Sequence, residues 1–319
     1  MLTEEHLVAL PGLSSRWVRL ATGAKAHYST AGETGPSVIL LHGALHGSSG
    51  HAAWSSMAPF LGANGFRVYC PDLPHFGLTE NHDVYPAGFA GAVDFVHDFA
   101  NALCLDQFNI GGNSNGACVA MSYTVNHPDR VLKMGLIASR GMLGLVDAEA
   151  MAHADPRPPE ERAYPEFDGT EASMRKMMSK LVYFPDRISD DLVAMRTFAG
   201  NKNLDGYHKR GRGLDDPNYL ARIDIRGRIQ RLTIPGIYVC GQQDVTSTLA
   251  ISHLQEEALT NFQVFYPEDT GHQGQTDQPE LLNQLFLEFF RDGRVSRQTA
   301  DRAGVSRRRP ELADVVEQA

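Results

Sequence analysis

Short apolar runs alternate along the chain with longer amphipathic stretches, and this alternation limits the possible fold more than any other feature of the sequence. Buried parallel strands give short apolar runs, and the helices that connect them give amphipathic stretches. The pattern therefore predicts an α/β fold with a mostly parallel central sheet flanked by helices. The predicted strands are residues 37–41, 66–70, 108–111, 131–138, 234–240 and 262–266, and the predicted helices are residues 53–61, 89–103, 117–126 and 279–291.

One long segment interrupts this rhythm. Residues 140–230 are rich in Met, Pro and charged residues, with helical spacing at 171–183 and 189–199. Because the strand pattern resumes at residue 234, we expect a helical lid inserted between two late strands; a separate partner-binding module is the alternative. The predicted division is a core of residues 1–139 and 231–291, a lid of residues 140–230 and a C-terminal extension of residues 292–319. The tail after Phe290 carries seven Arg and five acidic residues and is expected to be weakly docked or partly disordered.

Composition argues against several classes of protein. The 319 residues carry a formal net charge of −9, so no basic excess is available to neutralise a nucleic acid. The four cysteines form no Cys-x-x-Cys pair, which predicts neither a disulfide framework nor a zinc knuckle and fits a cytoplasmic protein. No signal peptide and no long apolar run is seen, so we expect no membrane partner. The expected partner is a small-molecule substrate, and the sequence leaves open whether the chain forms a homo-oligomer.

The strongest local signal is the sequence Gly-Asn-Ser-Asn-Gly at residues 112–116, directly after a predicted strand and before a predicted helix. A Gly-x-Ser-x-Gly turn in this position is typical of a nucleophile elbow, in which the glycines permit a tight turn that exposes the serine. The N-terminus of the following helix supplies backbone N–H groups for a developing oxyanion. Ser114 is therefore the predicted nucleophile; a glycine-rich turn with an idle serine is the alternative.

A serine nucleophile needs a histidine base and an acid that orients the base. His272 lies after the last predicted strand and before the closing helix, so its loop belongs to the same sheet edge as the elbow. Asp244 follows the strand before it and is the predicted acid. Glu268 and Asp269 are poorer candidates, because they are too close to His272 in sequence to reach its far nitrogen easily.

The oxyanion site needs two backbone N–H donors. One is predicted to be the amide of Asn115, and the other the amide of Ala44, or that of Leu45, in the turn after the first apolar run. His46 is in a loop at the mouth of the site and is placed to line the pocket. No spacing typical of metal ligands and no nucleotide-binding glycine motif is present, so neither a metal nor a cofactor is expected.

Together these motifs resemble the α/β-hydrolase superfamily over residues 25–290. Within it the chain is most similar to meta-cleavage-product hydrolases, which are serine enzymes that cleave carbon–carbon bonds in ring-fission products, and to the related esterases of monoalkyl phthalates. The motifs that carry the resemblance are His42-Gly43, Pro71-Asp72-Leu73-Pro74, Gly112–Gly116, Asn126–Val131, Gly241–Asp244 and Gly271-His272. The resemblance implies an α/β-hydrolase fold.

The resemblance also implies residues for substrate binding. Asn113, before the nucleophile, is typical of the group, and Arg196 falls where the family carries an arginine that contacts the acidic end of the substrate. The alternative for Arg196 is a solvated helix residue. Two departures border the acyl pocket: the family's glycine-proline-glycine run after His-Gly is replaced by residues 44–50, and Gln273 stands where the family has a tryptophan.

The sequence therefore predicts a serine hydrolase that cleaves a carboxylic ester, with a substrate that bears a free carboxylate, such as a monoalkyl ester of an aromatic diacid. Carbon–carbon cleavage of a vinylogous diketone is the alternative, because both reactions begin with the same triad. A hydrolase-fold receptor that binds without turnover is a third possibility, but a receptor has no need of the complete triad. Dehalogenases and epoxide hydrolases are excluded because they use a carboxylate where Ser114 stands.

Overall fold

The computed structural model describes residues 1–139, 145–204 and 221–308. An eight-stranded sheet forms the centre of the molecule, in the order β1-β2-β4-β3-β5-β6-β7-β8. From β4 to β8 all neighbouring strands are parallel, whereas β2 is antiparallel to both β1 and β4. The strands are β1 (Ser14–Arg19), β2 (Lys25–Ala31), β3 (Ser37–Leu41), β4 (Arg67–Pro71), β5 (Phe108–Asn113), β6 (Val131–Ile137), β7 (Gly236–Val239) and β8 (Phe262–Phe265).

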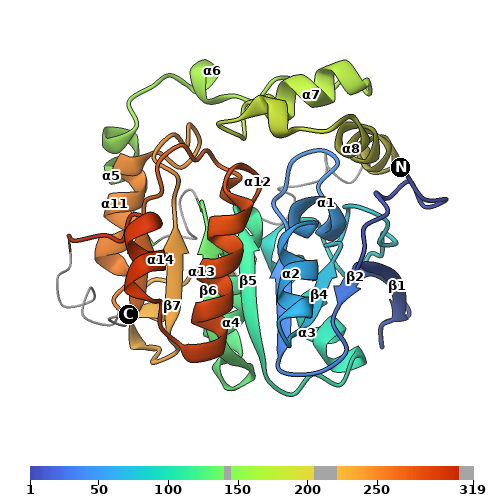
Figure 1. The fold of residues 1–319 in the computed structure, drawn as a ribbon, viewed down its shortest axis with the longest axis horizontal. Coiled ribbons are helices and arrows are strands. Elements are labelled where there is room, and N and C mark those ends of the chain that lie inside the picture. Colours follow the sequence, from blue (N-terminus) through green and yellow to red (C-terminus); the bar gives the residue numbers. More distant parts are fainter. Residues whose placement is uncertain (140–144, 205–220, 309–319) are drawn as a thin grey trace.

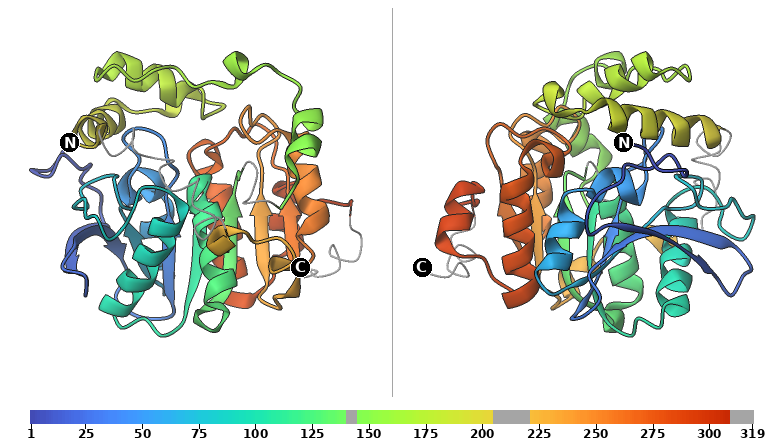
Figure 2. Two further views of the ribbon diagram at one scale, coloured as in Figure 1. Left: turned by 180° about the vertical axis from the view of Figure 1, so that it is seen from behind. Right: turned by 45° about the vertical axis from the view of Figure 1, so that its right-hand side comes forward.

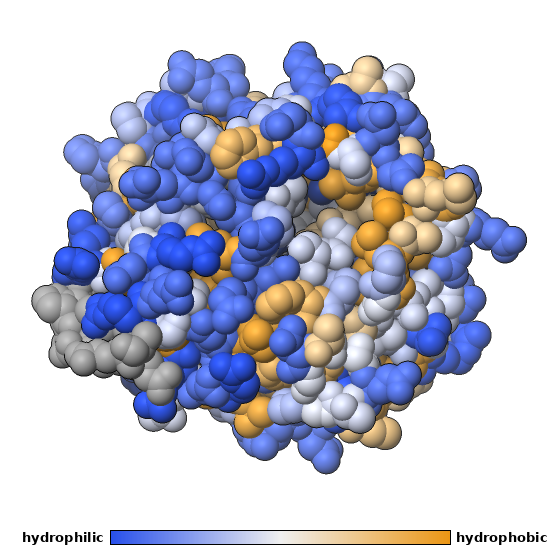
Figure 3. Space-filling model, in the orientation of Figure 1, coloured by the Kyte–Doolittle hydropathy of each residue, from blue (hydrophilic) through white to orange (hydrophobic). Residues whose placement is uncertain are grey.

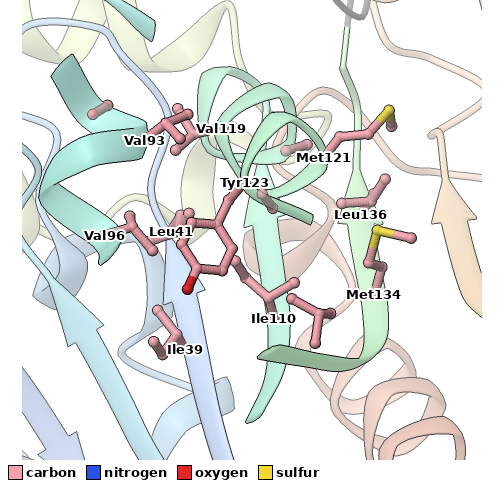
Figure 4. Close-up of a cluster of buried hydrophobic side chains, with 14 of the residues drawn as sticks. Ile39, Leu41, Val93, Val96, Ile110, Val119, Met121, Tyr123, Met134 and Leu136 are labelled. Atoms are coloured by element: carbon pink, nitrogen blue, oxygen red, sulfur yellow. The ribbon is translucent and has the colours of Figure 1, made fainter. Parts of the chain in front are cut away.

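Helices cover both faces of the sheet (Figure 1). Helices α3 (Phe89–Ala102) and α4 (Asn115–Asn126) pack on one face, and α2 (Met57–Ala63) and α13 (Pro279–Asp292) pack on the other. Double coverage explains why the strands are continuous apolar runs rather than alternating ones. In β3, Ile39 and Leu41 face the α3–α4 layer, while Val38 and Leu40 face the opposite layer. Figure 4 shows the first of these layers, with Tyr123 of α4 beside Ile110 and Leu41.

The inserted segment, defined here as described residues 145–204, lies between β6 and β7 in the sequence. Its helices are α5 (Ala148–Ala154), α6 (Pro159–Arg162), α7 (Glu171–Ser179) and α8 (Asp190–Lys202). In two views α6, α7 and α8 extend across one end of the sheet, the end at which α1 (Gly50–Trp54) and α12 (Gly274–Asp277) also lie (Figures 1 and 2). A small apolar cluster of its own, containing Met174, Met177 and Met178, holds this segment together. Parts of the predicted lid, residues 140–144 and 205–220, lie outside the described residues.

Two features of the fold differ from the sequence prediction. The hairpin of β1 and β2 was not predicted, and the single helix expected at residues 53–61 is two helices, α1 and α2, separated at Ser55 and Ser56. Serine is a weak helix former in the interior of a helix but a good terminal residue, and here Ser49 caps α1 by accepting from the amide of Ala52.

The tail also differs from the expectation of weak docking. Helix α14 (Arg297–Arg302) packs beside α13, and Val295, Ala300 and Ala303 are fully buried in the core layer. A single β-bridge pairs Val305 with Phe265 of β8. Small apolar residues bury as completely as large ones, which a count of large apolar residues in the tail overlooks. Residues 309–319 of the predicted extension lie outside the described residues.

The outer surface agrees with this burial of apolar groups. On the face drawn in Figure 3, apolar residues form limited areas that hydrophilic residues interrupt. Helix α11 (Leu249–Ala258) lies between β7 and β8 in the sequence. No described helix is both long enough and apolar enough to cross a membrane.

Candidate active site

Ser114 occupies a strained turn between β5 and α4. Its φ of 57° and ψ of −118° lie in a region that residues with a side chain rarely adopt. Both glycines of the motif are required by close packing: a Cβ on Gly112 would lie 2.3 Å from the carbonyl of Gly116, and a Cβ on Gly116 would lie 2.2 Å from the carbonyl oxygen of Leu41. The turn therefore brings the serine to the start of α4 only because these two positions carry no side chain.

His272 and Asp244 form a buried hydrogen-bonded pair. The Nδ1 atom of His272 lies 2.9 Å from Oδ2 of Asp244, and the two residues are 3% and 4% exposed. The other oxygen of Asp244 accepts from the backbone N–H groups of Thr246, at 2.7 Å, and Ser247, at 2.9 Å. A carboxylate held in this way keeps the Nδ1 proton on the imidazole and leaves Nε2 as the acceptor.

The other two acids that the sequence offered lie apart from this pair. Glu268 and Asp269 are exposed, and His272 bonds to Asp244 instead. The reason is topological: Asp244 follows β7, the strand next to β8, so its loop lies beside the histidine loop at the same sheet edge.

Ser114 and His272 both line a cavity of about 200 Å³. Among the described residues no hydrogen bond joins these two side chains, and such contacts are often long before substrate is bound. The rest of the wall comes from the loops after β3, β7 and β8, from the end of β5, from α3 and α4, and from the inserted segment. It comprises Gly43, Ala44, Leu45, Ser48, Phe89, Asn113, Asn115, Cys118, Tyr164, Leu181, Thr246 and Gln273.

The predicted oxyanion donors lie on this wall. Asn115 is the first residue of α4, and Ala44 follows the turn after β3, so both line the cavity beside the serine. The two turns touch, because a Cβ on Gly43 would lie 3.4 Å from Cβ of Ser114. His42 holds the β3 turn in place: its Nδ1 donates to the carbonyl of Gly43 at 2.6 Å, and its Nε2 accepts from the amide of Leu73 at 2.9 Å.

The role of His42 is structural. It is fully buried, and burial lowers its pKa, which favours the neutral ring that these two hydrogen bonds need. Its ring therefore fixes the turn that carries Ala44 and does not face the cavity as a second base.

Arg196 is buried in α8 and is not a solvated helix residue. It is 3% exposed, and its Nη2 donates to the carbonyl oxygen of His46, at 3.1 Å, and to Oγ of Ser48, at 3.3 Å. Burial lowers its pKa to about 10. Within the described part of the chain no carboxylate pairs with this guanidinium, and its Nε has no hydrogen-bond partner. Arg196 does not itself line the cavity, but Ser48, to which it donates, does.

The other three predicted substrate-binding residues have different surroundings. Asn113 lines the cavity, but its side chain donates to the carbonyl of His272 at 3.0 Å, so it ties the elbow to the histidine loop. Gln273 lines the cavity. His46 does not belong to its lining; its ring packs against Phe167 of the inserted segment, at 5.0 Å between ring centroids.

Sequence reasoning missed a polar pair in the wall. The hydroxyl of Tyr164, in the inserted segment, lies 2.6 Å from Oγ1 of Thr246, two residues after Asp244. The position of Thr246 next to the predicted acid was a usable signal, whereas nothing in the sequence pointed to Tyr164. Cys118 also lines the cavity, and its thiol lies 2.9 Å from Oγ of Ser139. The described residues contain no cluster of three metal-ligating side chains.

Comparison with known proteins shows the family to which the chain belongs. The family model described as alpha/beta hydrolase fold matches residues 36–279. A 2-hydroxy-6-oxononadienedioate/2-hydroxy-6-oxononatrienedioate hydrolase of Pseudomonas putida is 26% identical in an alignment of 301 residues that covers 87% of this chain and 96% of that protein. The monoacylglycerol lipase ABHD6 of Mus musculus is 25% identical over 82% of this chain and 78% of its own length.

Solved structures are similar in fold. A meta-cleavage product hydrolase from Pseudomonas fluorescens superposes with a TM-score of 0.69 at 24% identity, covering 87% of this chain and 98% of its own. An esterase from Thermogutta terrifontis superposes with a TM-score of 0.65 at 21% identity, again over 87% of this chain and 98% of its own. The same fold thus carries both carbon–carbon hydrolases and esterases.

Proposed function

Since the chain belongs to the alpha/beta hydrolase fold family and is a hydrolase, we propose that Ser114, His272 and Asp244 form its catalytic triad and that its substrate is a carboxylic ester bearing a free carboxylate. The observation that carries the proposal is the His272–Asp244 hydrogen bond of 2.9 Å at the wall of the cavity that also contains Ser114. A strained nucleophile, a base and an orienting acid at one cavity are the parts that acyl transfer to water requires.

The reaction proceeds in two halves. The Oγ atom of Ser114 attacks the ester carbonyl while Nε2 of His272 takes its proton, and the amides of Asn115 and Ala44 receive the oxyanion. Collapse expels the alcohol, to which His272 returns the proton. Water then attacks the acyl-enzyme with the same base and releases the acid. Asp244 stabilises the imidazolium in each half, because its second oxygen is already held by two backbone N–H groups.

Arg196 supports the acidic character of the substrate. A buried guanidinium without a carboxylate partner is costly, and a substrate carboxylate beside Ser48 would provide that partner. Arg196 acts on the cavity through Ser48: Oγ of Ser48 accepts from Nη2 of Arg196, and the hydroxyl proton of Ser48 is then free to be donated to a substrate carboxylate. A pKa of about 10 keeps Arg196 charged at neutral pH.

The second candidate function is carbon–carbon cleavage of an acidic ring-fission product. It is favoured by the relative from Pseudomonas putida, whose name describes hydrolysis of dienedioates and trienedioates. That class of substrate also bears carboxylates, so Arg196 fits either reaction. The ester is our first choice because the triad and oxyanion donors suffice for it; the relatives include both a dienedioate hydrolase and a lipase.

Turnover of a matched substrate panel tests the proposal. We expect a monoalkyl phthalate to be hydrolysed with a higher kcat/KM than its dialkyl counterpart, and a dienoic ring-fission product to be a poorer substrate. Faster cleavage of the ring-fission product would favour the second candidate. If no ester or dienoate is turned over and a serine-directed phosphonate does not label the protein, the chain is a binding protein and the catalytic proposal fails.

A further inference from the structure

Asp277 is a buried carboxylate that the catalytic cycle does not use. It ends the short helix α12, five residues after His272, and is fully buried. Its two oxygens accept three backbone N–H groups: that of Gly271 at 2.8 Å, that of Tyr183 at 2.9 and 3.0 Å, and that of Phe184 at 3.0 Å. Gly271 belongs to the histidine loop, whereas Tyr183 and Phe184 belong to the inserted segment. One carboxylate therefore joins two parts of the chain that lie about ninety residues apart.

Two further contacts join the same two parts of the chain, one on each side of His272. The amide of Gln273 donates to the carbonyl of Leu181 at 2.9 Å. A Cβ on Gly271 would lie 2.9 Å from the amide nitrogen of Tyr183, so the two backbones are as close as glycine allows. The residues before and after His272 are thus both attached to residues 181–184, and Leu181 of that stretch lines the cavity.

The surroundings of Asp277 act on the pKa of its carboxyl group in opposite directions. Burial raises its pKa, while the three N–H donors and the nearby Arg187 oppose that rise. Arg187 packs over the ring of Phe184, at 4.1 Å from the ring centroid. Hydrogen bonds from N–H groups to a buried carboxylate are stronger than neutral ones, and each unpaired group left behind by their loss is costly. The link between the two segments is therefore costly to break.

We propose that Asp277 is a positioning residue, which attaches the histidine loop to residues 181–184 of the inserted segment and so fixes the imidazole of His272 relative to Asp244 and Ser114. The inference rests on the proposed role of His272 as the base. Asp277 does not touch the cavity, so its effect reaches the reaction through the backbone on either side of His272. Small displacements of a catalytic group are enough to matter, since an error of about 1 Å can cost about 10²-fold in rate.

The test is a comparison of Asp277→Asn with Glu280→Gln, a change of an exposed carboxylate three residues along the chain. Asn cannot accept at both positions, so at least one N–H loses its partner. We expect Asp277→Asn to lower kcat, and the rate of labelling by a small fluorophosphonate, by about 10²-fold, with KM changed much less. Glu280→Gln should match the wild type in all three quantities.

A second variant separates positioning from folding. Gly271→Ala keeps the carboxylate but places a Cβ against the backbone of Tyr183, so it should slow labelling in the same way. This variant also decides the matter if Asp277→Asn does not fold. Folded variants that label at the wild-type rate would overturn the inference, and so would a fall in thermal midpoint with no change in labelling.

The parent proposal is tested alongside by His272→Ala. If His272→Ala keeps its activity, the triad is wrong and Asp277 has no base to position. If His272→Ala is inactive while folded Asp277→Asn and Gly271→Ala are fully active, only the inference about Asp277 fails.

Discussion

At the scale of single residues, the described part of the chain contains two Ser–His–Asp sets, and only one of these two has the surroundings of a catalytic site. In the second set, Ser15 Oγ lies 2.8 Å from Nε2 of His27, and Nδ1 of His27 lies 2.8 Å from Asp72. However, Ser15 lies on the edge strand β1 near the carboxylate of Glu5, and the Ser15 side chain lowers the pKa of that carboxyl group. A negative charge at the nucleophile opposes formation of an oxyanion. Ser114 instead precedes the N-terminus of α4.

This comparison predicts a single reactive serine. A fluorophosphonate should label the wild-type protein with one equivalent, and Ser114→Ala should abolish both labelling and turnover while the protein stays folded. Ser15→Ala is the matched control and should leave labelling unchanged. Intact-protein mass spectrometry counts the equivalents, and residual labelling of Ser114→Ala at Ser15 would contradict the distinction drawn between the two sets.

The acid of the triad gives a second prediction. Asp244→Asn should lower kcat by about 10⁴-fold, the size of the effect in a serine protease, because an amide favours the wrong tautomer of His272. The matched control is Asp269→Asn, which removes an exposed carboxylate from the same loop as His272 and should have little effect. Steady-state kinetics on one ester suffices. A larger loss in Asp269→Asn than in Asp244→Asn would reverse the assignment.

Arg196 gives a third prediction, which distinguishes an enzyme for acidic substrates from a general esterase. Loss of one partner of a buried charge pair costs about 2–5 kcal/mol, so Arg196→Ala should reduce kcat/KM strongly for a monoester and hardly at all for the matching diester. Arg196→Lys should recover only part of the loss. Equal losses on both substrates would show that Arg196 supports the inserted segment rather than the substrate.

Arg196 also predicts that the preference for a monoester over a diester depends on pH. The form of Arg196 that attracts a carboxylate is the protonated one, and its pKa is lowered to about 10 by burial. The ratio of kcat/KM for the monoester to that for the diester should therefore stay constant at neutral pH and fall as the pH rises through about 10. A ratio that does not change between pH 7 and pH 10.5 would contradict a guanidinium at the substrate.

At the scale of helices and strands, much of the structure follows from local sequence signals. The six predicted strands and the helices that cover them are present as β3 to β8, α3, α4 and α13, because a doubly covered strand must be apolar throughout. The hairpin β1–β2 was missed because it lies at the edge of the sheet: Arg16, Trp17 and Arg19 are exposed, so β1 lacks an apolar run.

The candidate site likewise contains residues that the sequence predicted and residues that it did not. The serine turn, the histidine and the acid follow strands, so their convergence at one sheet edge was predictable from the order of elements. Tyr164, Leu181 and Asp277 were not, since they depend on how the inserted segment lies over the sheet, which no local pattern determines. Arg196 was suggested by resemblance, but its burial behind Ser48 is a tertiary fact.

A prediction about the elbow concerns the packing of α4 against β3. Gly116→Ala places a Cβ 2.2 Å from the carbonyl oxygen of Leu41, so α4 must move and Ser114 must move with it. Overpacking of this kind costs about 1–3 kcal/mol of stability, and activity should fall further than stability does. Gly43→Ala is the control for stability, because its Cβ would meet its nearest neighbour only at 3.4 Å. Equal thermal midpoints for the two variants would contradict the close approach.

At the scale of the whole molecule, the tail completes one of the two core layers. Glu288 of α13 is 8% exposed, and its oxygens accept from the amide of Ser296 at 2.8 Å and the hydroxyl of Thr299 at 2.7 Å. The backbone after α14 also contacts the core, since the backbone N–H of Tyr266 donates to the carbonyl of Gly304 at 2.9 Å. The tail therefore covers both α13 and the edge strand β8, and the fold should depend on it.

The last prediction measures this dependence. Val295→Ala removes two methyl groups from a fully buried side chain and should cost about 1–2 kcal/mol of unfolding free energy, by analogy with other large-to-small core changes. Thr299→Val removes one of the two donors to Oε1 of Glu288, while Nε2 of Gln284 still donates to that oxygen at 2.8 Å. It should cost about 1–3 kcal/mol, because a hydrogen bond to a charged group contributes more than a neutral one. Arg302→Ala, an exposed change on the same helix, is the control and should stay within about 0.5 kcal/mol. Urea unfolding at constant pH gives all three values. If Val295→Ala and Thr299→Val are as stable as Arg302→Ala, the tail is loosely attached in solution. In either case kcat of the folded variants should be unchanged, because no described residue of the tail reaches the wall of the cavity.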